Sequence, residues 1–87
     1  HLNENLYTVA TKISNCMYML QFTFDTITNA QAIDALVHSV AIDLWLNHSI
    51  EALQTSAGQL AFEHERDRTL ALLACSSNQL YTVQILD

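Results

Sequence analysis

Residues 29–58 read NAQAIDALVHSVAIDLWLNHSIEALQTSAG and carry an apolar stripe that changes sides partway along. The first part of the stripe recurs at the helical steps of three and four, and it consists of Ile33, Leu36, Val37, Val40 and Leu44. The second part keeps that spacing but falls roughly opposite the first on a helical projection, and it consists of Ile42, Leu46, Ile50, Leu53 and Ala57. A single helix with this pattern needs apolar partners on two sides, which favours self-association. A break near residues 42–47, giving two shorter helices, is the alternative explanation.

Helix-boundary signals stand at both ends of this stretch. Thr28 and Gln31 form a candidate capping box, and Asn29 is an equally good N-cap. Gly58 is placed for the left-handed residue that commonly follows a helix. We therefore predict a helix from about residue 29 to residue 57.

The flanking segments, residues 5–24 and 59–86, also show helical spacing. The first has a heptad-like seam made of Leu6, Val9, Ile13, Cys16 and Leu20. In the second, Glu63, Glu65 and Asp67 lie in the early turns, where the helix dipole favours acidic side chains. A competing signal is the period-two alternation at residues 18–24 and 81–85, which would pair as two short strands. Helices are favoured because each stretch continues a helical stripe without a turn signal.

Turn-forming residues are scarce throughout the chain. Proline is absent and glycine occurs once, at Gly58. An all-β fold is hard to build from such a sequence, because tight hairpins favour glycine-containing turns. We predict an all-α fold in which residues 1–87 form a single helical domain of three long antiparallel helices. The resulting helical bundle is expected to be completed by dimerisation.

Composition restricts the kinds of partner. Hydrophobic residues make up 51% of the chain and charged residues only 14%, against about 25% charged in a typical domain. Part of the apolar surface is therefore expected to be covered by another copy or another protein. The net charge of −6 argues against binding to nucleic acid or to anionic lipid. With no membrane-spanning run and no signal-peptide pattern, we expect a cytoplasmic protein.

Few residues suggest catalysis, metal binding or redox chemistry. Cys16 and Cys75 are interpreted as buried small hydrophobes, with a disulfide between them as the alternative. Asp34 with His38, and His48 with Glu51, could each supply half of a metal site. The two pairs point to different sides of a helix, so no metal and no cofactor is predicted. Because no nucleophile elbow or phosphate-binding loop is present, we also predict that the protein is not an enzyme.

The predicted function is a protein–protein interaction module, expected to be a homodimeric small regulator, adaptor or inhibitor of a larger protein. Trp45 lies where the stripe switches sides, and Trp is enriched at interface hot spots. The charge cluster at residues 63–68 is either a docking patch or a solvated helix start. The predicted interface residues are Ile42, Trp45, Leu46, Ile50, Leu53, Arg66 and Arg68. The alternatives are a helical bundle that binds a small apolar ligand or a metal, and a structural subunit of a larger assembly.

Overall fold

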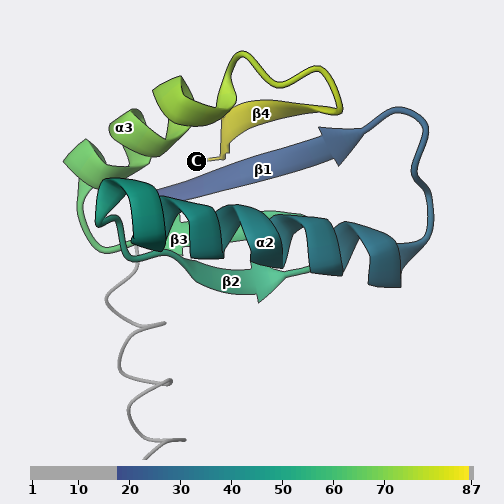
Figure 1. The fold of residues 1–87 in the computed structure, drawn as a ribbon, viewed down its shortest axis with the longest axis horizontal. Helices are drawn as coiled ribbons and strands as arrows, with labels where there is room; N and C mark the ends of the chain where they lie inside the picture. The colour runs from purple at the N-terminus through teal and green to yellow at the C-terminus, as the bar shows by residue number, and fades with distance from the viewer. Residues whose placement is uncertain (1–17, 87) are drawn as a thin grey trace, which may run out of the picture.

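Strands and helices are mixed along the chain in the computed structural model, which describes residues 18–86. This part of the chain forms a four-stranded antiparallel sheet and two helices (Figure 1). The elements are, in order, β1 (Tyr18–Phe24), α2 (Ala30–His48), β2 (Leu53–Ser56), β3 (Gln59–Phe62), α3 (Glu65–Cys75) and β4 (Tyr81–Leu86). The prediction of an all-α bundle of three long antiparallel helices is therefore wrong, because the structure is of the α+β class.

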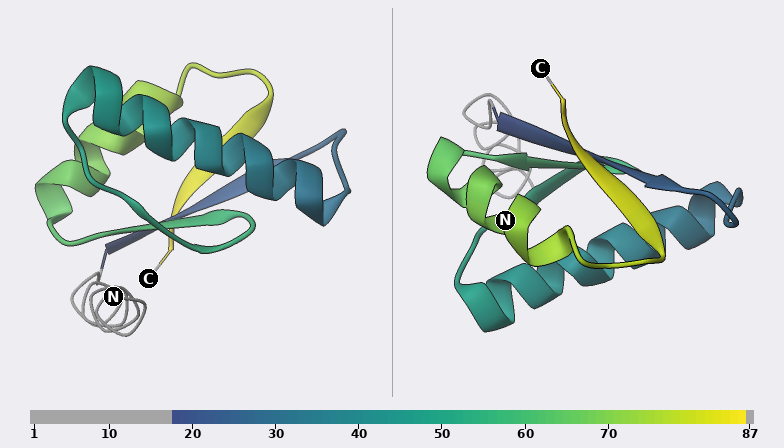
Figure 2. Two further views of the ribbon diagram at one scale, coloured as in Figure 1. Left: turned by 60° about the horizontal axis from the view of Figure 1, so that its bottom comes forward. Right: turned by 90° about the horizontal axis from the view of Figure 1, so that it is seen from above.

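The strand order across the sheet is β2-β3-β1-β4. β1 is antiparallel to both of its neighbours, β3 and β4, and β2 is antiparallel to β3. β1 and β2 are consequently parallel to each other with β3 between them, and α2 makes the crossover. Both helices lie on the same side of the sheet (Figure 2). This is the split βαβ, or ferredoxin-like, arrangement.

β1 occupies a central position because every second side chain is apolar and faces the helices. Leu20, Phe22 and Phe24 are all buried. They lie opposite Ile85, Val83 and Tyr81 of β4, and the Phe22 and Tyr81 rings meet edge to face with their centroids 5.1 Å apart. The period-two alternative is thus confirmed for residues 18–24 and 81–86, and the helical prediction is wrong there. Residues 5–17 of the predicted first helix lie outside the described residues.

α2 begins as its sequence indicates but ends earlier than predicted. The Asn29 side-chain oxygen accepts hydrogen bonds from the backbone N–H groups of Gln31 and Ala32, at 2.8 and 3.2 Å. At the other end, Ser49 adopts the left-handed conformation with φ of 55°. The Ile50 N–H then donates to the Leu44 carbonyl at 3.0 Å, and the Ile50 side chain is buried in the core. The prediction of an unbroken helix to residue 57 is wrong, and the break follows residue 48 rather than falling within 42–47.

Gly58 lies in the turn between β2 and β3, not at a helix end, so its predicted role as a C-terminal helix cap is wrong. Its φ is not positive, so the backbone conformation does not require glycine. Glycine suits this position because the backbone of β1 approaches it closely. The Gly58 carbonyl accepts from the Phe22 N–H at 2.7 Å, and a Cβ at this position would stand 3.0 Å from the Phe22 carbonyl oxygen. The other connections within residues 18–86 run through helices, so this sheet needs a single tight hairpin. A chain with one glycine can therefore form this sheet, and the argument from turn-forming residues against strands does not apply.

Residues 59–86, predicted as one helix, form β3, α3 and β4. Glu65 and Asp67 lie in the first turn of α3, as the charge pattern indicated, whereas Glu63 precedes this helix. The helix buries Ala71 and Cys75 against the sheet and ends at Cys75. The core between the helices and the sheet is made of Leu20, Phe22, Phe24, Val37, Leu44, Ile50, Leu60, Phe62, Ala71 and Cys75.

Candidate functional site

α2 buries one apolar side and exposes another. Val37 and Leu44 are buried against the sheet. Ile42 and Leu46, from the second part of the stripe, remain 45% and 72% exposed, and Trp45, where the stripe switches sides, is 58% exposed. Their exposure at adjacent positions on one helix marks a contiguous apolar surface, which is the usual sign of a contact site for another molecule.

This surface forms one wall of an open groove between α2 and β2, which we call the α2–β2 groove. The groove has a volume of about 420 Å³. Its other wall is fixed to the helix, because the Gln54 side-chain amide donates to the Asp34 carbonyl oxygen at 3.1 Å and to its carboxylate at 3.2 Å. The groove is lined by His38, Ala41, Ile42, Trp45, Leu46, Ala52, Leu53 and Gln54.

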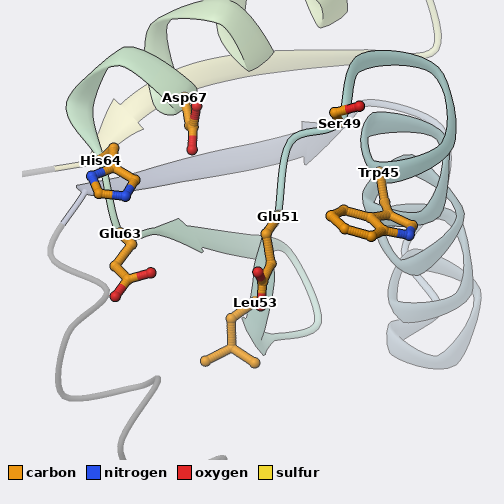
Figure 3. Close-up of a pocket in the computed structure, with 8 residues that line it drawn as sticks. Trp45, Ser49, Glu51, Leu53, Glu63, His64 and Asp67 are labelled. Carbon is orange, nitrogen blue, oxygen red and sulfur yellow. The ribbon is translucent and has the colours of Figure 1, made fainter.

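A second depression, which we call the acidic hollow, adjoins the groove and shares Trp45, Ala52 and Leu53 with it. Its volume is about 240 Å³, and its carboxylates come from Glu51, Glu63 and Asp67. Figure 3 shows Asp67 directed from α3 into the hollow, with Trp45 on the opposite side. Three separate segments thus bring acidic groups next to an exposed apolar groove.

The predicted interface residues do not all lie in one place. Ile42, Trp45, Leu46 and Leu53 come together around the α2–β2 groove. Ile50 lies in the core, and Arg66 is exposed on α3.

Arg68, another predicted interface residue, is buried to 9% exposure. Its guanidinium lies 5.3 Å from the centre of the Tyr18 ring and 3.6 Å from the Glu65 carboxylate. The charge cluster at residues 63–68 therefore divides. Arg68 turns inward, while Glu63, His64 and Asp67 line the acidic hollow. The hollow was missed from the sequence because β2 and β3, which bring Glu51 and Glu63 to it, were not predicted.

Cys75 is a free, buried thiol beneath α3. Desolvation raises its pKa, with an opposing contribution from the Tyr81 hydroxyl, which donates a hydrogen bond to the sulfur. Burial also raises the pKa of Tyr81. Because the thiolate is the reactive form of cysteine, this environment makes Cys75 a poor nucleophile. The prediction of a buried small hydrophobe fits Cys75, and Cys16 lies outside the described residues.

The residues considered for metal binding do not meet in a common site. Within residues 18–86, no three His, Cys, Asp or Glu side chains are grouped so that they could hold a metal ion. Asp34 accepts from Gln54, and His38 lines the α2–β2 groove. Neither described helix has the length and apolar character needed to cross a lipid bilayer.

Comparison with known proteins finds no matching family model, curated protein or solved structure. The fold by itself does not indicate an activity, since ferredoxin-like domains carry many unrelated functions. The function therefore has to be argued from the α2–β2 groove and the acidic hollow.

Proposed function

We propose that this chain is a protein-interaction module that binds a segment of a partner protein along α2 and β2. The observation that supports this most is the contiguous exposure of Ile42, Trp45 and Leu46 beside a groove on a small domain. Such a module would act as a regulator, adaptor or inhibitor of the protein that it binds. We also infer a cytoplasmic location, because a free Cys75 thiol suits a reducing compartment.

The shape of the groove favours a protein segment over an enclosed small molecule. Ligand pockets bury about 70–90% of a drug-sized ligand, whereas here Leu46 and Trp45 stand on the rim of an open groove. A partner's apolar side chain could cover them in the way that a central hot spot is covered at an interface. Covering a Leu side chain fully contributes about 1.5–3 kcal/mol, and truncating an interface hot-spot residue costs about 2 kcal/mol or more.

The negative charge of the acidic hollow indicates that the partner carries a basic residue. Glu51, Glu63 and Asp67 surround the hollow on the far side of Trp45, in a chain with a net charge of −6. A Lys or Arg next to the partner's apolar side chain would enter this hollow and be attracted by the carboxylates. The partner we propose is therefore a segment that carries an apolar residue with a neighbouring basic residue.

The experiment is selection of random displayed peptides on the full chain, followed by titration of the enriched peptides. Trp45 is the single tryptophan of the chain, so its fluorescence reports binding at this surface. We expect the enriched peptides to combine an apolar and a basic residue and to change that fluorescence. Leu46→Ser should weaken binding by at least about tenfold, which corresponds to 1.4 kcal/mol.

The matched control is Leu73→Ser on α3, since Leu73 is 66% exposed and Leu46 is 72% exposed. This control should leave the affinity unchanged. Glu63→Gln with Asp67→Asn should weaken the peptides with a basic residue and spare those in which that residue is replaced by norleucine. Failure to enrich any peptide, enrichment of acidic peptides, or equal sensitivity to the two leucine substitutions would contradict the proposal.

A further inference from the structure

β4 forms one border of the sheet built by residues 18–86. It pairs with β1 in an uninterrupted register from Met19 opposite Leu86 to Phe24 opposite Tyr81. On its other side the described residues provide no further strand. An edge strand presents backbone N–H and C=O groups that can pair with another chain.

The two edges of the sheet differ in how they are protected. β2 has four residues and a register shift between Gln54 and Ser56, and such irregularity disfavours the addition of another strand. β4 has six residues and no register shift, and its sequence YTVQIL contains neither proline nor a charged residue. Within residues 18–86, β4 therefore lacks the short length, irregular register, proline and charge that usually prevent strand addition.

The side chains of β4 also leave part of the core incompletely covered. Ile85 lies opposite Leu20, which is fully buried, yet Ile85 itself is 46% exposed. Tyr81 and Val83 share its face of the sheet, on the side of the helices. A further strand beyond β4 would cover this open end of the core.

We propose that a second copy of this chain pairs with β4 through its own β4, in antiparallel orientation about Val83. In this register Tyr81 of one copy lies opposite Ile85 of the other on the helix side, and Thr82 lies opposite Gln84 on the other side. The two sheets join into one eight-stranded sheet, a size that open sheets reach. The apolar face becomes continuous across the junction.

Charge favours β4 over the α2–β2 groove as the contact between copies. Each copy carries a net charge of −6, so two copies repel each other. Contact through the α2–β2 groove would bring two acidic hollows together, whereas residues 69–86 contain no formal charge. The same reasoning leaves the groove open for the basic partner, and the dimer does not depend on that proposed function.

Charged substitutions on β4 test both the contact between copies and its register. Dimerisation is followed by measuring the mass of the full chain by sedimentation equilibrium. Thr82→Lys with Gln84→Lys would place like charges opposite each other, and Thr82→Lys with Gln84→Glu would place opposite charges there. We expect a dimer for the unmodified chain, loss of the dimer in the first variant and its recovery in the second. The double lysine change lowers the net negative charge, so general repulsion cannot explain a loss.

Thr55→Lys on β2 is the matched control and should leave the dimer intact. If the double lysine variant does not fold, hydrogen exchange of the unmodified chain supplies the test. The β4 amides that point away from β1 should become protected as protein concentration rises. A monomer at every concentration, a dimer unaffected by the paired lysines, or a dimer lost through Thr55→Lys would overturn the proposal.

Discussion

Leu44 and Leu46 lie two positions apart on α2 and offer a direct test of which side of the helix holds the fold together. Leu44 is 1% exposed and Leu46 is 72% exposed. Replacement by alanine changes the intrinsic helix propensity equally at both positions, so the difference between the variants reports burial alone. Leu44→Ala removes a side chain from the core between α2 and the sheet.

The expected magnitudes follow from these exposures. A buried Leu→Ala change costs about 2.7–5 kcal/mol, because transfer energy and a cavity both contribute. A chain of this size has an unfolding free energy of about 4–13 kcal/mol at the usual value per residue. Leu44→Ala should therefore remove a large fraction of this free energy. Leu46 has only roughly a quarter of its side chain covered, so its truncation should cost under about 1 kcal/mol.

Urea unfolding measures both variants, with Trp45 fluorescence and far-ultraviolet circular dichroism as independent probes. The midpoint should fall sharply for Leu44→Ala and little for Leu46→Ala, at an unchanged slope. If Leu44→Ala does not fold, Ile50→Val and Ile42→Val give a milder comparison between a core residue just after α2 and an exposed residue on it, with about 0.5–1.5 kcal/mol expected for the buried Ile50. Equal losses at positions 44 and 46, or a greater loss at 46, would refute this assignment of buried and exposed sides.

Two further predictions concern the backbone and pH. Ser49→Gly should raise the unfolding free energy by about 0.5–1 kcal/mol, because Ser49 has φ of 55° and glycine adopts this region without the penalty of a Cβ. The control is Ser76→Gly, which should lower the unfolding free energy because Ser76 has φ of −67°. Melting-temperature shifts of the same sign for the two variants would contradict this explanation. Burial raises the pKa of Cys75 and of Tyr81, so the folded chain keeps protons that the unfolded chain releases above about pH 8.5 and pH 10 respectively. The contribution of these two groups to stability should therefore be complete below about pH 8.5 and should decline as the pH rises. The Cys75→Ala variant should begin to lose stability at a higher pH than the unmodified chain. Stability that increases between about pH 8.5 and pH 10 would be inconsistent with these raised pKa values.

The sequence was most informative where a structural signal lies within one segment. Asn29 predicted the start of α2, and the switch of the apolar stripe placed Ile42 and Leu46 on a different side from Val37 and Leu44, although Ile50 of the same second set is buried. Only a few neighbouring residues decide such features, because capping and helical periodicity act over one or two turns.

Residues 18–24 show why local patterns misled the prediction of fold class. Leu20 fits both a helical stripe and an alternating strand, so seven residues cannot separate the two periods. What decides between them is that Phe22 and Phe24 pair with β4 and meet the Tyr81 ring edge to face, although Tyr81 is far away in the sequence. Similarly, one glycine is enough for this sheet because the β1–β2 and β3–β4 connections run through helices.

From the sequence alone come the start of α2, its two apolar sides, the negative charge and the lack of a recognisable catalytic motif. The tertiary structure alone decided that α2 ends at His48, that β1 joins β4, and that Glu51, Glu63 and Asp67 gather beside Trp45. The physical reason is that a turn of helix is stabilised by its near neighbours, whereas a strand is stabilised by partners whose positions exist only after the chain has folded.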